Sequence, residues 1–342
     1  MARAISSLRG VRQVALAAVC GVLAMSLTAC ATGSATKGSE QAQPVGEIKK
    51  PTRKPELLVL KQIISGGWLV AGLDANGLPL AGAAQGFSAL VLPSALAVRD
   101  PDLYIADSGA RKLYRFDTAM QVMSVVPGED VLPWIRVQVG LDRSLYVLDP
   151  ARGVIRRHPP GGQPPRILGD SLAIGSLEGF VIDENVGGII ASDNLNRRLL
   201  VFNPLGGAGW PIDQTVELPS LGAMAGDGRT VYAIDNGCAC IVALDEAGRV
   251  SGRIGQGELV QPRELAADRH GHIFVSDAGN RSLKVFLRGK LLANYGAQTL
   301  HFTEISALAV DEDTLYLADG PGSQVLAFRI QASVGERGPE DR

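Results

Sequence analysis

Six stretches of the same pattern recur through most of the chain at a nearly constant interval. Each is a short apolar segment ending in an aspartate, and the six stand at Asp107, Asp149, Asp193, Asp235, Asp277 and Asp319, separated by 42, 44, 42, 42 and 42 residues. Three positions before the aspartates stand Tyr104, Tyr146, Ile190, Tyr232, Phe274 and Tyr316. Six positions after them stand Leu113, Ile155, Leu199, Ile241, Leu283 and Val325. A register kept through six copies indicates one structural unit repeated six times.

The fifth copy shows the secondary structure of one unit most clearly. Apolar segments cover residues 265–267, 273–276, 282–287 and 291–295, and turns containing Gly, Asp or Asn separate them. Short segments alternating with such turns predict a four-stranded antiparallel sheet. One such sheet cannot bury both faces by itself, whereas sheets stacked around an axis cover one another. We therefore predict an all-β fold, a six-bladed β-propeller of four-stranded antiparallel blades.

The sixth unit ends after its third strand near Ile330, so another segment has to complete the last blade. Residues 69–81 resemble residues 241–252, which span the third strand and the beginning of the fourth in the fourth unit. We therefore expect the N-terminal segment to close the ring, with Leu78 to Ala81 as the added strand. Residues 57–73 are then surplus strands.

The repeat resembles the NHL repeat of known propellers. The stretch Asp277-Ala-Gly-Asn280-Arg281-Ser-Leu283-Lys-Val285-Phe286 matches that family's turn-and-strand signature closely, and the resemblance covers about residues 90 to 330. What it implies is the propeller fold. It leaves the function open, because NHL propellers include sensors, scaffolds, RNA-binding proteins and lyases.

The first thirty residues have the pattern of a secretory signal. Three arginines precede an apolar run from Val14 to Leu27, which is short for a membrane span. The run ends in Leu27-Thr28-Ala29-Cys30, which resembles the lipobox of bacterial lipoproteins. The resemblance implies cleavage before Cys30 and a diacylglycerol thioether on its sulfur. Ala31 favours the outer membrane in that family, where an aspartate at this position tends to retain the protein in the inner membrane.

These patterns predict four regions and a location. Residues 1–29 are the signal peptide, residues 30–56 the lipidated cysteine with a flexible tether, residues 57–330 the propeller and residues 331–342 a disordered tail. We expect the protein to be anchored to the outer membrane by lipid, facing the periplasm. The 33 basic and 35 acidic residues give a net charge of -2, and the propeller has no long basic run. The sequence therefore does not indicate a nucleic-acid partner.

Candidate binding residues lie in the turns that follow the repeating aspartates. Basic and amide side chains in these turns suit polar or anionic partners, and the candidates are Arg111, Asn196, Arg197, Asn280 and Arg281. The aspartates themselves are expected to bond the backbone of their own turns. The leading hypothesis is a non-enzymatic binding or scaffold propeller for a protein or an envelope polymer, without a cofactor.

The alternative hypothesis is a metal-dependent hydrolase acting on a lactone or ester. Propeller lactonases of the gluconolactonase type hold a metal at the channel mouth, and Ca²⁺ takes six to eight oxygen ligands. Here Glu178, Glu264 and Glu304 are the candidate ligands. Glu178 and Glu304 differ in register from Glu264 by two residues, so solvated or ion-paired glutamates are the favoured interpretation.

The cysteines and histidines add one further candidate feature. Cys238 and Cys240 stand two residues apart in a turn of the fourth unit, where they could form a disulfide, remain free thiols, or have a metal or redox role. His270 and His272 are expected in the turn between the first two strands of unit five. At most His301 is placed for the channel, so a zinc lyase is not indicated.

Overall fold

The computed structural model describes residues 56–70, 84–161, 163–168, 174–183, 188–205, 210–212, 219–245 and 247–331. All of them belong to one compact unit, Lys54–Arg342, and Met1–Arg53 form a separate unit. The predictions for the signal, Cys30 and the tether up to residue 55 lie outside the described residues, as does the tail from residue 332. In the described part, the only helix is α1 (Ala297–Leu300), and no helix there is long and apolar enough to cross a membrane.

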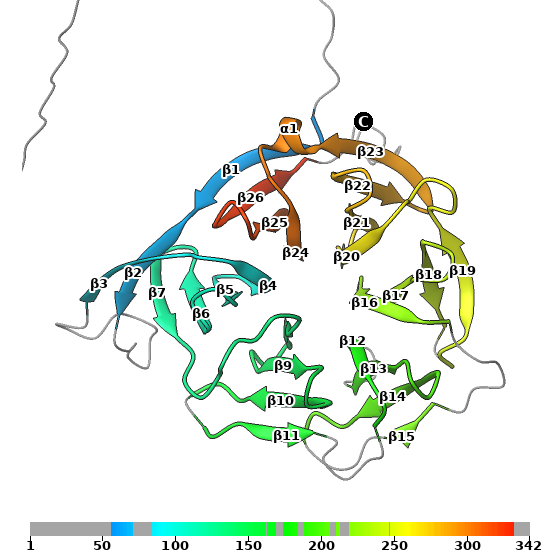
Figure 1. The fold of residues 1–342 in the computed structure, drawn as a ribbon, viewed down its shortest axis with the longest axis horizontal. Helices are drawn as coiled ribbons and strands as arrows, with labels where there is room; N and C mark the ends of the chain where they lie inside the picture. The colour runs from blue at the N-terminus through cyan, green and yellow to red at the C-terminus, as the bar shows by residue number, and fades with distance from the viewer. Residues whose placement is uncertain are drawn as a thin grey trace, which may run out of the picture. The chain divides into compact units, whose positions relative to one another are not determined.

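Six antiparallel sheets stand around a central axis, which confirms the predicted propeller (Figure 1). We number the blades one to six and name their strands a to d from the axis outward. Blade one contains β4 (Pro93–Arg99), β5 (Asp102–Asp107), β6 (Lys112–Asp117) and β7 (Val122–Val125). Blade two contains β8 (Arg136–Val139), β9 (Leu145–Asp149), β10 (Val154–His158) and β11 (Arg166–Leu168). Blade three contains β12 (Leu177–Asp183), β13 (Gly188–Asp193), β14 (Arg198–Phe202) and β15 (Trp210–Pro211).

The remaining three blades repeat this arrangement. Blade four contains β16 (Leu221–Gly226), β17 (Val231–Asp235), β18 (Cys240–Leu244) and β19 (Val250–Ile254). Blade five contains β20 (Pro262–Ala267), β21 (His272–Asp277), β22 (Ser282–Leu287) and β23 (Lys290–Gly296). Blade six contains β24 (Ile305–Asp311), β25 (Thr314–Asp319), β26 (Gln324–Ile330) and, from the other end of the described chain, β1 (Leu58–Ile64).

An N-terminal strand closes the ring, as predicted, but the predicted segment was wrong. Strand β1 pairs antiparallel with β26, from Leu58 opposite Ile330 to Ile64 opposite Val325, so it occupies the fourth position that we assigned to Leu78–Ala81. Those four residues lie outside the described part. The physical reason is burial: Leu58 and Ile64 are both almost completely buried against blade six and its neighbours, which anchors β1 at its two ends.

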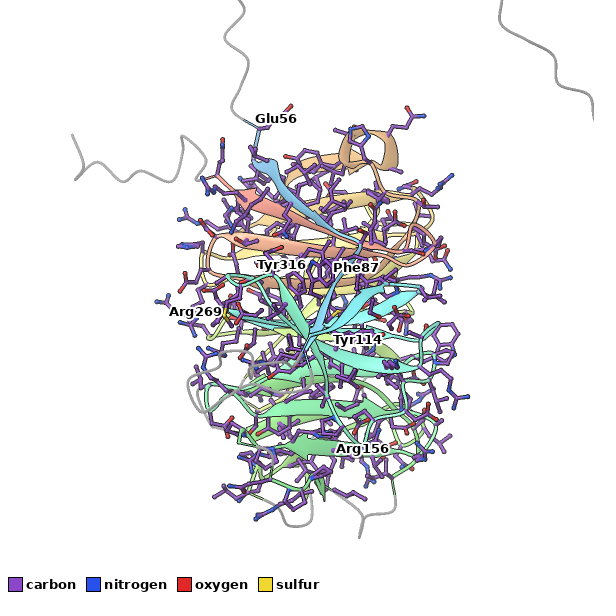
Figure 2. The ribbon with its side chains drawn as sticks, turned by 90° about the vertical axis from the view of Figure 1, so that its left-hand side faces the viewer. Glu56, Phe87, Tyr114, Arg156, Arg269 and Tyr316 are labelled. Carbon is purple, nitrogen blue, oxygen red and sulfur yellow. A yellow bond between two sulfur atoms is a disulfide. The ribbon has the colours of Figure 1, made fainter. Side chains whose placement is uncertain are left out.

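A further hairpin enlarges blade one beyond its four strands. Strand β2 (Gly66–Val70) runs parallel to β7, and β3 (Ala84–Ala89) pairs with β2 at the edge of a six-stranded sheet. Figure 2 views this side of the ring, with Phe87 on β3 beside the meeting point of blades one and six. The rings of Trp68 and Phe87 meet edge to face with centroids 6.0 Å apart, and both side chains are more than half exposed.

The repeating apolar positions form the contacts between blades. Tyr104 and Leu113 of blade one lie in one buried cluster with Val137 and Val147 of blade two. The same two positions of every other blade enter the cluster shared with the next blade around the ring. Each blade therefore depends on its neighbours to bury its apolar face, which explains why the sequence keeps these positions apolar.

The repeating aspartates connect two segments, not one. In blade one the buried Asp107 carboxylate accepts a hydrogen bond from Ala110 N–H in its own turn at 2.9 Å. It also accepts from Val91 N–H at 2.7 Å and from Leu92 N–H at 2.9 Å, in the loop that enters strand a. The predicted bond within the turn is present, and the bonds to the entering loop were not predicted.

Blades three, five and six use the aspartate in the same way. Asp193 accepts from two loop amides at 3.0–3.1 Å, Asp277 from two at 2.8–3.3 Å, and Asp319 from two at 2.9–3.1 Å. Burial raises the pKa of the Asp193 and Asp277 carboxyls, but their hydrogen-bond donors lower it overall, below the usual aspartate range.

Blades two and four differ, because proline replaces the first of the two loop residues, at Pro133 and Pro219, and proline has no N–H to donate.

We expect Asp107→Ala to destabilise the protein strongly. The change removes three hydrogen bonds to a charged acceptor, worth about 1.5–3 kcal/mol each, so the free energy of unfolding should fall by about 3 kcal/mol or more. Urea denaturation measures the change. The matched control Asp130→Ala removes an exposed carboxylate from the surface and should leave the unfolding midpoint unchanged. Equal effects of the two substitutions would contradict the role of Asp107.

Two neighbouring isoleucines of β1 test the closing strand. Ile64 is 2% exposed and Ile63 is 53% exposed. Ile64→Ala should therefore lower the free energy of unfolding by about 2–4 kcal/mol, whereas Ile63→Ala should change it by less than about 0.5 kcal/mol. If both variants melt like the parent protein, β1 does not close the ring.

Candidate ligand-binding cavity

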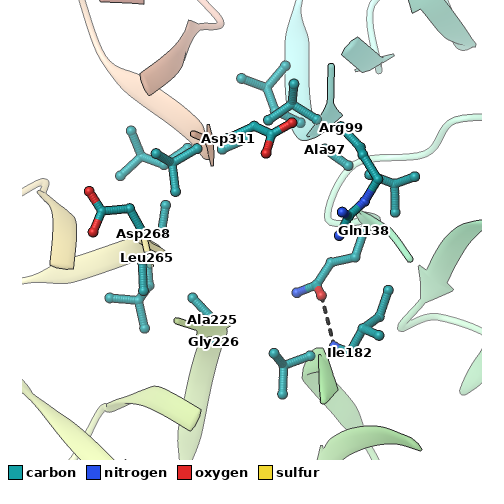
Figure 3. A pocket seen from close by; sticks show the side chains of 18 of the residues that line it. Ala97, Arg99, Gln138, Ile182, Ala225, Gly226, Leu265, Asp268 and Asp311 are labelled. Carbon is teal, nitrogen blue, oxygen red and sulfur yellow. Dashed lines mark hydrogen bonds between the residues drawn. The ribbon is translucent and has the colours of Figure 1, made fainter. Parts of the chain in front are cut away.

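The inner strands of all six blades surround a cavity of about 750 Å³ on the axis. Its lining combines polar groups with apolar residues of the inner strands, among them Ala97, Ile182, Ala225 and Leu265 around the opening in Figure 3. The lining extends through the turns between strands a and b, such as Asp227–Gly228 and Asp311–Asp313. The cavity therefore reaches the face of the ring that carries these a–b turns, which we call the mouth.

An ion pair crosses the axis near the other end of the cavity. Arg136, at the start of β8 in blade two, donates from Nη1 to Glu264 Oε2 of blade five at 2.9 Å. Blades two and five stand on opposite sides of a six-membered ring. Arg136 Nε also donates to the Glu178 carbonyl oxygen at 2.9 Å. Arg136 of blade two therefore contacts both blade three and blade five, and its ion pair with Glu264 places two charged side chains across the channel.

The surroundings of Glu264 perturb its acidity. Its side chain is only 19% exposed, and burial raises the pKa of the carboxyl above the usual glutamate range. The Arg136 guanidinium acts in the opposite direction but does not cancel the effect of burial. Glu264 is thus held in place by a cation at the inner end of the cavity.

Gln138, two residues after Arg136, connects blade two with blade three. Its Nε2 donates to the Phe180 carbonyl at 2.7 Å, and its Oε1 accepts from Ile182 N–H at 3.0 Å (Figure 3). Both ends of the amide are therefore used by the backbone of the adjacent inner strand. Gln138 could not be predicted from the sequence, because a lone glutamine has no motif around it.

Charges of both signs surround the mouth. Figure 3 shows Arg99 on one side and Asp268 and Asp311 on the other. Asp311 accepts from Asp100 N–H at 2.6 Å, and Arg143 donates to the Asp100 carbonyl at 3.0 Å. The mouth can thus offer hydrogen-bond donors and carboxylates to one ligand at the same time. These residues could not be predicted as one group from the sequence either, since they come from several different repeats.

One of the two histidines near the mouth is not where the sequence indicated. His270 lies in the a–b turn of blade five, as expected, and lines the cavity. His272 is instead the first residue of β21 and is buried, with its Nδ1 2.7 Å from Asp268 Oδ2. The turn is one residue tighter than predicted, which moves His272 into the strand. His301 follows α1 and is exposed.

The five predicted binding residues lie in the b–c turns of blades one, three and five, on the face opposite the mouth. Asn196 and Asn280 donate to the aspartates of their own turns, at 2.7 Å and 2.9 Å. Arg111 pairs with Asp130 on the surface. Arg281 donates to the Thr303 carbonyl at 3.1 Å, and it shares a left-handed backbone with Arg111 and Arg197. Several of these side chains therefore hold the turns themselves.

The three glutamates predicted as metal ligands have separate surroundings. Glu264 pairs with Arg136, the Glu178 carboxylate accepts from Ser176 Oγ at 3.1 Å, and Glu304 is exposed at the entrance to β24. Within the described ranges, the only group of three such side chains whose ligand atoms lie within 4.8 Å of one another is Asp235, Cys238 and Cys240. The structure joins these two cysteines in a disulfide.

Comparisons with known proteins support the fold and leave the family open. No family model matches the sequence, and no curated protein matches it. Among solved structures, a gluconolactonase from Xanthomonas campestris is 16% identical, with a TM-score of 0.54 over 71% of this chain and 87% of that one. An auxiliary nutrient binding protein from Bacteroides ovatus is 13% identical, with a TM-score of 0.55 over 79% and 76%.

An inactive variant of virginiamycin B lyase from Staphylococcus aureus, crystallised with quinupristin, is also similar. It is 11% identical, with a TM-score of 0.54 over 80% of this chain and 98% of that one. At such identities the similarities show a shared propeller fold, and they do not transfer an activity.

We expect removal of Arg136 to raise the pKa of Glu264 further. In Arg136→Gln the buried carboxylate loses its cation, so the folded protein holds the Glu264 proton more tightly than the unfolded chain does. The variant should accordingly lose stability relative to its parent as the pH rises above about 4.3, the usual glutamate value. NMR titration of the Glu264 carboxyl carbon measures the shift. Arg143→Gln, at the mouth, should leave that titration unaltered, and an unaltered titration in Arg136→Gln would contradict the pairing.

Proposed function

We propose that this protein is a non-enzymatic binding propeller of the bacterial cell envelope, whose central cavity receives a polar group of a protein or an envelope polymer. The observation that carries the proposal is the cavity of about 750 Å³, which combines apolar residues of the inner strands with polar groups and has oppositely charged side chains at its mouth. Binding sites for small groups commonly combine an apolar concave wall with a few polar groups that fix orientation. The named neighbours include a nutrient-binding protein, which fits a binding role for the fold.

The proposed location rests on the lipobox-like sequence that ends in Cys30. A lipid on this cysteine would hold the propeller at the outer membrane, on the periplasmic side. The 25 residues between Cys30 and Glu56 would serve as the tether. Mass spectrometry of the mature N-terminus tests the anchor directly: we expect an acylated Cys30, and Cys30→Ser should move the protein from the membrane to the soluble fraction.

The structure favours the mouth over the predicted b–c turn residues as the place of contact. Asn196 and Asn280 are engaged with their own aspartates, so releasing them for a partner would weaken the turns. Side chains at the mouth border a cavity instead. We therefore propose contact through the a–b turns, with Arg111, Arg197 and Arg281 as the alternative surface.

The hydrolase alternative has less support from the geometry. A site for Ca²⁺ would need Glu178, Glu264 and Glu304 to converge, yet Glu264 is paired with Arg136 on the axis. Freeing Glu264 would leave the partly buried Arg136 guanidinium without its counter-ion, which is costly. The gluconolactonase similarity concerns the fold alone.

Crosslinking to envelope extract tests the binding proposal. We expect Glu312→Lys, at the mouth, to reduce capture of the partner about tenfold or more, because charge reversal at a contact costs several kcal/mol. Glu258→Lys makes the same change on the opposite face and should capture the partner normally. Arg111→Ala reports on the alternative surface. A parent protein that captures nothing, or capture unaffected by Glu312→Lys, would contradict the proposal.

A further inference from the structure

The b–c turn aims particular side chains at the repeating aspartate. Three positions after the aspartate, Asn196 donates to Asp193 at 2.7 Å, and Asn280 donates to Asp277 at 2.9 Å. Five positions after it, Arg198 donates to Asp193 at 3.1 Å. In blade six the fifth position is occupied by Gln324, which donates to Asp319, also at 3.1 Å. In blade three the side chains at the third and fifth positions therefore converge on one buried carboxylate, and in blades five and six one of the two does.

Blade four places its two cysteines at these same positions. Cys238 is the third residue after Asp235 and Cys240 is the fifth, with Ala239 between them in the left-handed conformation that Arg197 and Arg281 adopt in their turns. Both sulfurs and a carboxylate oxygen of Asp235 lie within 4.8 Å of one another. The two cysteines thus occupy the two turn positions that point toward the aspartate in blade three, and both sulfurs lie near the Asp235 carboxylate.

Asp235 also lacks partners that its counterparts possess. Pro219 occupies the place of the first loop amide that bonds the other aspartates, and Gly237 N–H donates to Asp235 at 2.8 Å. In blade five Lys284 supports Asp277 at 2.6 Å, but Val242 stands at that position in blade four. Within the part of the chain that the structure describes, no cation pairs with the Asp235 carboxylate. The carboxylate is only 3% exposed, so it has acceptor capacity available inside the turn.

We propose that reduction of the Cys238–Cys240 disulfide converts this turn into a Zn²⁺ site, with two thiolates and the Asp235 carboxylate as ligands. Cys238 is partly exposed and can be attacked by a dithiol reductant, while Cys240 is buried. The dithiol donates two electrons and two protons: the protein S–S bond breaks, a disulfide forms in the reductant, and two thiols remain. Zinc binding then releases both thiol protons to solvent.

The ligand chemistry selects zinc over calcium or magnesium. Thiolate sulfur is a soft ligand that suits Zn²⁺, and catalytic zinc sites commonly combine three protein ligands with a water molecule. Two thiolates and a carboxylate would place three negative charges in one small, largely buried turn. A divalent cation removes most of this repulsion, so the reduced turn should bind metal whereas the oxidised turn should not.

Calorimetric titration with Zn²⁺ tests the site in full-length protein carrying Cys20→Ser and Cys30→Ser, which leaves Cys238 and Cys240 as the only cysteines. We expect the dithiol-reduced protein to bind one equivalent at least about 100-fold more tightly than the oxidised protein. In the reduced protein, Cys238→Ser and Asp235→Asn should each weaken Zn²⁺ binding by at least about tenfold. Loss of a residue that only hydrogen-bonds a metal ligand already costs about this much affinity. Equal affinity of the oxidised and reduced proteins would overturn the proposal.

A second measurement needs no substitution in the turn. In the reduced protein, Zn²⁺ should protect both cysteines from alkylation by iodoacetamide, whereas Mg²⁺ should not. Thiolate-to-metal charge-transfer absorption on addition of Cd²⁺ should appear at the same stoichiometry. Unprotected cysteines at saturating Zn²⁺ would overturn the site even if a variant of Asp235 failed to fold.

Discussion

The propeller depends on one repeated interaction, in which a buried aspartate at the end of strand b accepts hydrogen bonds from two separate segments. One segment is the aspartate's own turn, and the other is the loop that enters strand a of the same blade. The loop amides thereby gain a fixed, charged acceptor, and the inner strand begins at a defined place. Because the inner strands of blades one, three, five and six start in this way, carboxylates that lie outside the central cavity position most of its wall.

Much of this fold could be predicted from the sequence, because the interactions that define each blade are local and recur along the chain. The residues three positions before the aspartates and the aliphatic residues six positions after them pack in the same way in every blade. The aspartates bond the entering loop in blades one, three, five and six, so the spacing of all three positions is visible in one sequence. The closing strand was harder to predict. Leu58–Ile64 and Leu78–Ala81 are both short apolar segments, and only contact with β26 distinguishes them. The hairpin of β2 and β3 has no counterpart in the repeat, so periodicity could not predict its pairing with β7.

The candidate site was largely beyond sequence reasoning for the opposite reason. Arg136 and Glu264 are 128 residues apart, and they meet because blades two and five face each other across the axis. Glu264 was selected as an acidic residue at the start of an inner strand, but its role as the partner of Arg136 follows only from ring geometry. In contrast, the position of Cys238 and Cys240 near Asp235 can be understood from the same turn in the other blades, which shows the positions that point toward the aspartate. A residue that departs from the repeat in a single blade is therefore informative.

Hydrogen exchange resolved to single amides tests the central role of the aspartates most directly. Val91, Leu92, Val260, Gln261, Thr303 and Glu304 lie in loops, yet their N–H groups bond buried carboxylates. We predict that these loop amides exchange as slowly as those of the inner strands, and that the protection of Val260 and Gln261 persists below the usual aspartate pKa of about 3.9, because the pKa of Asp277 is lowered. Exchange at the rate of ordinary exposed loop amides at neutral pH would contradict it.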